Sequence, residues 1–300
     1  MNQPTPAIVT QSAVLRLPRI ALILFCVAYV LPGFLGREPW KNADVSALGV
    51  MLEMAMGHSG WWSPQVLGVA VEEAGPLPYW LGAVFIKLLP FFSPEFAVRV
   101  PFAMLLALTL VCTWYTVYHL ARQPAAQPVQ FAFGGEAKPT DYARALADAG
   151  LLALMACLGL AQLSHETTPD VARLASTAAL LLGAARLAHA GHHHPWRSLG
   201  WWAVGLAGLL FSGAAWLSMV LGIGLLAILW LVSLRTAGPT HADEATLEVG
   251  QAPRWAASLV YAGLMTAGMG LDLFAPVSPL AMLARLPWDS WARLLLWFTW

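Results

Sequence analysis

Residues 98–121 read VRVPFAMLLALTLVCTWYTVYHLA, and this stretch decides the fold. After Arg99 it contains no Asp, Glu, Lys or Arg. A helix of about 20 apolar residues is long enough to cross a hydrocarbon core of about 30 Å. The stretch therefore predicts a helix that spans a membrane.

Apolar runs of the same character lie on both sides of this stretch. The run at 199–234 is too long for one crossing, so it predicts two helices with a break near Ser212 and Gly213. We therefore expect an all-α, polytopic transmembrane helical bundle. Its other expected helices lie at 20–35, 76–92, 143–163, 170–189 and 254–275.

The composition supports the same fold class. Hydrophobic residues make up 59% of the chain and charged residues 11%, and the mean hydropathy is +0.65. Soluble proteins carry about 25% charged residues, which they need to cover a surface that faces water. The net charge is zero, so the chain has no overall attraction to nucleic acid, and we expect no nucleic-acid partner.

The basic residues near the start predict the orientation of the first helix. Arg16 and Arg19 precede the apolar run at 20–35, and no small-residue cleavage site follows that run. Basic residues stay on the cytoplasmic side of a membrane. We therefore expect an uncleaved helix with a cytoplasmic N-terminus, in a multi-pass protein of the cell inner (plasma) membrane.

The same rule orients the later loops. It places two of them in the cytoplasm through Arg122, Lys138, Arg144 and Arg197. The segment 164–170 is then outside, which requires one earlier segment not to cross. The segment 76–92 is short and is interrupted by Lys87, so we expect it to be the one that does not span.

Residues outside the helices complete the expected domain organisation. Residues 1–14 are polar and are expected to be disordered, while 15–300 form one transmembrane domain. Residues 36–75 form the first outer loop, and apolar residues at helical spacing from Val45 to Met56 predict a short helix lying in the membrane interface. The final apolar run from Leu294 supplies barely half a span, so the chain is expected to stop inside a helix of a longer protein.

Polar residues able to carry chemistry gather in three segments, PWKNAD at 39–44, VEEAGPLPYW at 71–80 and SHETTPD at 164–170. Acidic residues at a membrane edge are energetically costly, which makes them functional candidates. An acid at a helix N-terminus also stabilises the helix, so Glu73 and Asp170 have a structural alternative. The candidates are Lys41, Asp44, Glu73, Tyr79, Arg99, His165, Glu166 and Asp170.

These motifs resemble the GT-C membrane glycosyltransferases. The first apolar run ends in Leu-Pro-Gly at 31–33 and is followed by Pro-Trp-Lys-x-x-Asp at 39–44. A Glu-x-x-Pro-Leu-x-Tyr-Trp element at 73–80 opens the next helix, and Arg-Val-Pro at 99–101 resembles the family's Arg-Leu-Pro step. Within this class the chain is most similar to two groups of enzymes. One is glycosyltransferase family 39, whose members resemble the dolichyl-phosphate-mannose-protein mannosyltransferases. The other is the lipid A aminoarabinose transferases.

The resemblance implies an enzyme that moves a sugar from a polyprenyl-phosphate donor to an acceptor at the outer, periplasmic face of the membrane. The acceptor would be lipid A, a protein or another glycan. Asp44 matches the family's acid in the first outer loop and would take the proton of the acceptor hydroxyl. Asp170 matches a later acid at a helix start and is the second expected catalytic residue.

The other candidates receive binding roles. Positive charge near the leaving phosphate stabilises it, which suits Lys41 and Arg99. A divalent metal ion, if the reaction uses one, would be held by His165 and Glu73, whose nitrogen and oxygen atoms suit such ions. The expected substrate-binding residues are Glu73, Lys41, Arg99, Tyr79 and Glu166.

Two alternatives to the transferase stay open. Ala74 replaces the lysine expected after Glu73, and the element at 210–214, which ends in Ala214, lacks a lysine that the family has. Both departures would suit a catalytically inactive membrane scaffold related to these enzymes. The other alternative is a lipid or solute transporter or flippase, which should show repeats with helices broken at matching positions. The sequence shows no such repeat.

Overall fold

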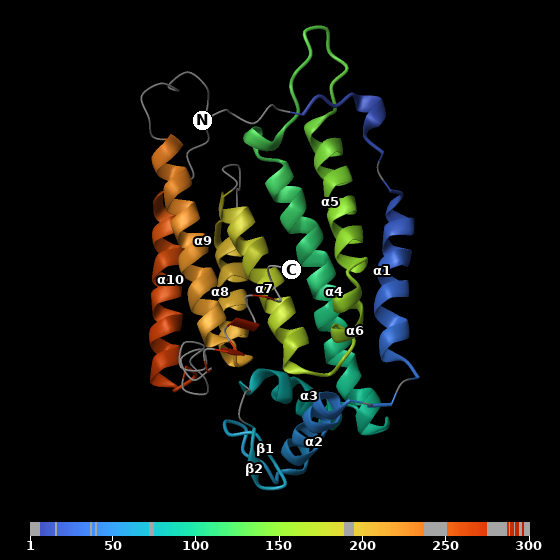
Figure 1. Cartoon of the computed structure of the whole chain (residues 1–300), viewed down its shortest axis with the longest axis vertical. Coiled ribbons are helices and arrows are strands. Elements are labelled where there is room, and N and C mark those ends of the chain that lie inside the picture. The colour runs from blue at the N-terminus through green and yellow to red at the C-terminus, as the bar shows by residue number, and fades with distance from the viewer. Residues whose placement is uncertain are drawn as a thin grey trace.

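The computed structural model describes residues 7–15, 17–36, 38–39, 41–71, 75–188, 195–236, 251–274, and positions 287, 289, 290, 292, 293 and 296. This part of the chain is mostly helical, as expected for an all-α protein. Long, roughly parallel helices form a bundle, and a smaller layer of two helices and a β-hairpin covers one end of it (Figure 1).

The long helices correspond closely to the apolar runs. The bundle consists of α1 (Arg19–Phe34), α4 (Pro94–Ala121), α5 (Pro139–Met155), α7 (Pro169–Ala188), α8 (Pro195–Phe211), α9 (Ala215–Thr236) and α10 (Gln251–Gly270), with the short α6 (Leu158–Leu163) following α5. The covering layer consists of α2 (Asn42–Met56), α3 (Leu77–Leu88), β1 (Gln65–Val66) and β2 (Val69–Ala70), and two 3-10 helices lie at Gln11–Ala13 and Pro124–Ala126.

Two of the described helices, α4 and α7, are long and apolar enough to cross a membrane by length and composition. The stretch at 98–121 lies within α4, which begins where the Ser93 hydroxyl accepts the Phe96 amide hydrogen. Such a cap satisfies one of the free amides at a helix start. In α7, 67% of the apolar window is buried inside the protein, so this helix occupies the centre of the bundle.

The predicted break in the run at 199–234 is confirmed. The chain turns between α8 and α9 at Ser212 to Ala214, where Gly213 has a φ of 75°. Glycine adopts this left-handed conformation without steric cost, which is why it commonly ends helices. The Ala214 amide donates to the Leu209 carbonyl at 3.0 Å and closes the turn.

The segment 143–163 differs from its expected form. It was expected to be one helix and is instead α5 and α6, separated at Ala156 and Cys157. Cys157 has an extended backbone with a ψ of 105°, which ends the helical path. Neither Pro nor Gly stands at this break, so the sequence gives no signal for it.

The segment 36–75, which was expected to form the first outer loop, contains the expected helix and an unexpected hairpin. The helix expected at Val45 to Met56 is α2, and α3 lies beside it at the same end of the bundle (Figure 1). With 12 residues, α3 is about 18 Å long, short of the roughly 30 Å of a hydrocarbon core. The two-residue turn of the hairpin has positive φ at Leu67 and Gly68, the geometry of a tight β-hairpin turn.

The described residues near the N-terminus contact a loop far away in the sequence. Residues 7–14 pair with the loop that leads into α5, where the Gln11 side chain is bound at both of its amide atoms. Gln11 Nε2 donates to Asp141 Oδ2 at 3.0 Å, and Gln11 Oε1 accepts from the Lys138 amide at 2.7 Å. Such pairing is a tertiary contact between segments far apart in the sequence, which polarity alone does not reveal. The run expected from Leu294 lies, apart from Leu296, outside the described residues.

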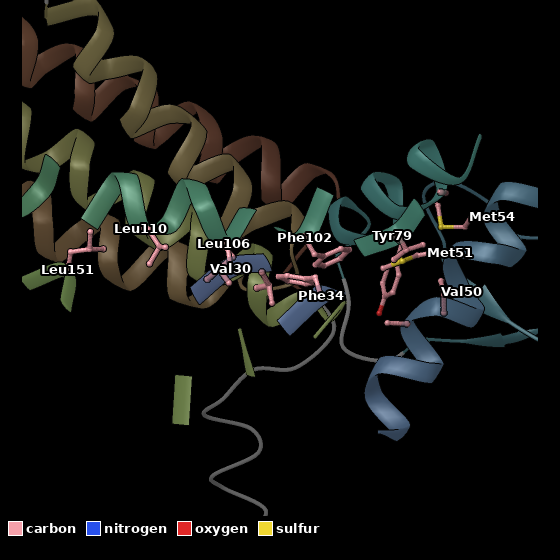
Figure 2. Close-up of a cluster of buried hydrophobic side chains, with 14 residues drawn as sticks. Val30, Phe34, Val50, Met51, Met54, Tyr79, Phe102, Leu106, Leu110 and Leu151 are labelled. Atoms are coloured by element: carbon pink, nitrogen blue, oxygen red, sulfur yellow. The ribbon is translucent and has the colours of Figure 1, made fainter. Parts of the chain in front are cut away.

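A cluster of buried apolar side chains joins the covering layer to the bundle (Figure 2). Met51 and Met54 from α2 pack near Tyr79 of α3, and Phe102 of α4 continues the cluster towards the interior of the bundle. These side chains are at most 3% exposed. The packing fixes α2 on the bundle and therefore fixes the residues at the start of α2.

Candidate functional site

Asp44 lies in the first turn of α2 and is buried, with 3% of its surface exposed. Its Oδ1 atom accepts two hydrogen bonds from Thr167, one from the backbone amide at 2.8 Å and one from the hydroxyl at 2.5 Å. A buried carboxylate needs such donors, because the loss of water around a charge is otherwise very costly. The N-terminus of α2 adds a favourable partial positive charge. Thr167 therefore fixes the orientation of the carboxylate.

The loop that supplies Thr167 is polar and almost completely buried. Its five residues, Ser164 to Thr168, are between 1% and 7% exposed, although they connect α6 to α7. Connecting loops normally run over the surface, because a buried loop must find partners for its polar groups. A loop that is buried in this way places its side chains with high precision.

Lys41 and Glu166 form the second contact between the start of α2 and this loop. Lys41 Nζ lies 2.6 Å from Glu166 Oε1, and the side chains are 32% and 4% exposed respectively. The buried carboxylate thus has its charge partner at the edge of the site, where the ammonium still reaches solvent. Glu166 was expected to bind substrate directly, whereas the structure places it against Lys41, where it positions that ammonium group.

His165 connects the loop to α1. Its Nδ1 lies 2.7 Å from the Ala161 carbonyl oxygen, and its Nε2 lies 2.8 Å from the Tyr29 carbonyl oxygen. Carbonyl oxygens only accept, so a hydrogen on either ring nitrogen has an acceptor in place. Gly33 makes room for this ring, because a Cβ atom there would lie 1.9 Å from His165 Cδ2.

Of the two residues expected to hold a metal ion, only His165 lies among the described residues. Both ring nitrogens of His165 face carbonyl oxygens of the protein, at 2.7 Å and 2.8 Å. Across the residues that the structure describes, no group of three or more His, Cys, Asp or Glu side chains is arranged to hold a metal ion. Glu73, the second expected ligand, lies outside the described residues.

A cavity of about 590 Å³ lies next to the start of α2. It is lined by Val45, which follows Asp44, and by residues from the start of α4. Its charged residues are Arg99, Glu38 and Glu95. Arg99 Nη1 donates to the Phe34 carbonyl at 3.4 Å, at the end of α1, so the guanidinium group lies between α1 and the cavity.

Two of the expected site residues lie away from the buried cluster. The Asp170 side chain is 62% exposed and pairs with Arg173 at 2.9 Å, and Arg173 Nε donates to the Ser212 carbonyl at 2.9 Å. Tyr79 is 3% exposed and belongs to the apolar cluster with Met51 and Met54. The structure thus places Asp170 near the α8–α9 break and Tyr79 in the core.

Gly75, just before α3, lies against the turn between α8 and α9. A Cβ atom at Gly75 would lie 2.1 Å from the Phe211 carbonyl oxygen and 2.3 Å from the Gly213 amide nitrogen. The backbone before α3 therefore touches the α8–α9 break directly. Arg173, which binds the Ser212 carbonyl, supplies a cation at this junction.

Sequence reasoning missed Thr167, Gly33 and Arg173. Thr167 is next to the expected residues His165 and Glu166, but its partner Asp44 is 123 positions away. Gly33 was noted only as part of a Leu-Pro-Gly motif. Its role depends on the His165 ring, which comes from the loop between α6 and α7. Arg173 follows Asp170 by three positions, a spacing that brings side chains together on a helix.

No family model, no curated protein sequence and no solved structure matches this chain. The fold and site together define a mostly helical protein with a buried carboxylate cluster at one end of its bundle. In chemical terms, this cluster offers one carboxylate fixed by hydrogen bonds and one ammonium group at the edge. A cavity that Arg99 lines adjoins Val45, the residue after Asp44.

Proposed function

We propose that this protein is a multi-pass membrane glycosyltransferase of the GT-C type. It transfers a sugar from a polyprenyl-phosphate donor to an acceptor at the outer face of the cell inner membrane. The motif resemblance suggests this class, and the arrangement of charge in the fold supports it. Asp44 and its neighbours lie at the end of the bundle covered by α2 and α3 (Figure 1).

The basic residues support the orientation. Arg19 starts α1, and Arg122 directly follows α4, so both lie at the end of the bundle opposite to α2. Arg144 near the start of α5 and Arg197 near the start of α8 lie at the same end as Arg19 and Arg122. Because basic residues remain in the cytoplasm, this end is cytoplasmic and Asp44 faces outward. A short α3 that stays at the outer end is consistent with this arrangement.

The observation that carries the proposal is the buried Asp44 carboxylate held by Thr167 beside the Lys41–Glu166 pair. Catalytic groups need fixed geometry, and two hydrogen bonds to one carboxylate oxygen provide it. A simple structural acid at a helix start needs no such burial. The position at one end of the bundle matches a donor whose lipid lies in the bilayer and whose sugar lies at the interface.

The transfer step assigns a role to each group. The acceptor oxygen attacks the anomeric carbon, and its hydroxyl proton moves to the Asp44 carboxylate. The bond between the anomeric carbon and the phosphate oxygen breaks, and its electron pair leaves with the polyprenyl phosphate. Lys41 stabilises the negative charge on that phosphate, and Arg99 supplies a second cation in the adjoining cavity. Glu166 keeps the Lys41 ammonium group in place.

A transfer assay in membranes tests the proposal. Membranes that contain the protein receive polyprenyl phosphates with radiolabelled sugars, and lipid and protein fractions are scanned for label. We expect transfer that requires the protein and is lost with Asp44→Asn. The control is Asp289→Asn, which removes an exposed acid that pairs with Arg293 on its own helical turn. Transfer by the Asp44→Asn protein at the wild-type rate, or no protein-dependent transfer from any donor, would refute the proposal.

A further inference from the structure

A groove runs along α1 between this helix and α4, at some distance from the Asp44 cluster. Two adjoining cavities form it, and both are lined by Leu22, Ile23, Trp114 and Tyr115. The first cavity, about 670 Å³, opens at the N-terminal end of α1, and the second, about 530 Å³, continues to Val30 and Leu31. The shared residues make the two cavities one continuous groove.

The two parts of the groove differ in chemistry. The deeper part is lined mainly by aliphatic side chains, among them Val27, Leu110 and Leu151. On α1 the apolar part runs from Leu22 to Leu31, a distance of about 14 Å at 1.5 Å per residue. One leaflet of a bilayer core is about 15 Å deep, half of the roughly 30 Å total. The apolar part therefore has the length of a single acyl chain in one leaflet.

The mouth of the groove carries two cations. Arg19 from α1 and Arg144 from α5 line it. Neither arginine takes part in an ion pair among the residues that the structure describes. Arginine presents a planar set of donors that matches the geometry of phosphate oxygens.

One acid, Asp148, also lines the mouth, but its oxygens are engaged elsewhere. Its Oδ1 accepts from Trp114 Nε1 at 2.8 Å, and its Oδ2 accepts from the Leu17 amide at 3.2 Å. It is 7% exposed and so is turned away from solvent. Asp148 thus fixes one wall of the groove, and the formal charge at the mouth stays positive.

We propose that this groove binds an anionic phospholipid of the cytoplasmic leaflet. The phosphate lies between Arg19 and Arg144, and one acyl chain lies along the apolar wall formed by α1 and α4. The two arginines at the mouth favour a lipid with a negatively charged head group. The apolar part of the groove is long enough for one acyl chain of the cytoplasmic leaflet. This inference presupposes that the helices lie in a membrane, and it does not require glycosyl transfer.

Native mass spectrometry of the purified full chain in detergent tests the inference. The probes are dioleoyl phosphatidylglycerol and dioleoyl phosphatidylcholine, which share their acyl chains and differ in net charge. We expect at least tenfold tighter retention of phosphatidylglycerol, lost in the Arg19→Gln/Arg144→Gln protein. Inorganic phosphate at millimolar concentration should not displace the lipid, since it lacks the chain. Arg197→Gln, a basic residue at the same end but outside the groove lining, is the matched control and should leave retention unchanged.

A second variant tests the apolar part of the site independently of charge. Ala107 lines the deeper cavity, so Ala107→Phe fills it and should reduce retention of phosphatidylglycerol at least tenfold. Equal retention of the two lipids, or wild-type retention by the Arg19→Gln/Arg144→Gln protein, would overturn the inference. Displacement by inorganic phosphate would also overturn it, because the site would then recognise the anion alone. Each measurement detects lipid that stays bound to the protein. A loss of sugar transfer would therefore leave the result unchanged.

Discussion

The two ends of α1 contact polar regions that are built in opposite ways. At its C-terminal end, Gly33 admits the His165 ring, and the neighbouring loop buries charged and polar groups that bind one another. At its N-terminal end, Arg19 faces an open groove and forms no described ion pair. One region is closed and internally satisfied, while the other is open and carries uncompensated positive charge.

The difference shows how the same residue types serve different purposes. A buried charge pair contributes little net stability but is costly to break, so it fixes geometry. An exposed arginine contributes little to stability and remains available to a ligand. The closed end therefore suits chemistry that needs fixed positions, and the open end suits reversible binding. Substitutions should be costly at the first end and nearly neutral at the second.

The largest effect should come from Lys41→Met. It leaves the Glu166 carboxylate, which is 4% exposed, without its cation, and breaking such a buried pair costs about 3 kcal/mol. Thermal unfolding in detergent measures the loss. A second change, Glu166→Gln, should recover part of it because no buried charge then remains. If Lys41→Met alone melts like the wild type, the pair does not hold this end of the molecule together.

Gly33→Ala should have the next largest effect. The added Cβ would lie 1.9 Å from the His165 ring, and overpacking of this kind costs about 1–3 kcal/mol. The matched control is Gly263→Ala in α10, where a Cβ atom meets nothing within 4 Å. Alanine is the better helix former, so the control should be neutral or more stable by up to about 1 kcal/mol. Equal melting temperatures for the two variants would show that the His165 ring is not packed on Gly33.

Thr167→Val should have a moderate effect on stability and a clear effect on transfer. The variant keeps the side-chain shape but removes the hydroxyl donor to Asp44 Oδ1, at a cost of about 1–2 kcal/mol. Sugar transfer should fall about tenfold because the carboxylate loses part of its orientation. The control Thr177→Val removes a hydroxyl that donates only to the Arg173 carbonyl of its own helix. Similar transfer rates for the two variants would contradict the role of Thr167.

Arg144→Gln should have the smallest effect on stability. The side chain lies at the open groove and forms no described ion pair, so the free energy of unfolding should change by less than about 0.5 kcal/mol. Differential scanning fluorimetry in detergent free of added lipid provides the measurement. A loss comparable to that of Lys41→Met would mean that both ends are structural and that the contrast between them fails.

The sequence predicted most helices because their apolar length is itself the physical reason that they form. The runs at 98–121 and 170–189 became α4 and α7, and Gly213 marked the break between α8 and α9. The break at Cys157 and the hairpin at 65–70 were not predicted. The first has no breaking residue, and the second has strands of only two residues, too short to show a pattern.

The candidate site was predicted in its residue types but not in its contacts. Asp44 and Glu166 were singled out because acids at a membrane edge are costly, and Lys41 because positive charge suits a leaving phosphate. Their contacts depend on α2 being held against the loop before α7 by the apolar cluster in Figure 2, which sequence spacing cannot show. Tyr79 illustrates the limit, because an aromatic ring with a hydroxyl suits both a binding site and a core.

The most direct test of the account separates donor binding from transfer in purified Asp44→Asn protein. Asparagine retains an oxygen that accepts from Thr167, so the site should stay folded and bind the polyprenyl-phosphate sugar within about threefold of the wild type. Transfer should be at least about 100-fold slower, since the amide cannot take the acceptor proton. Wild-type transfer, or loss of donor binding as large as the loss of transfer, would contradict the role of Asp44 as the base.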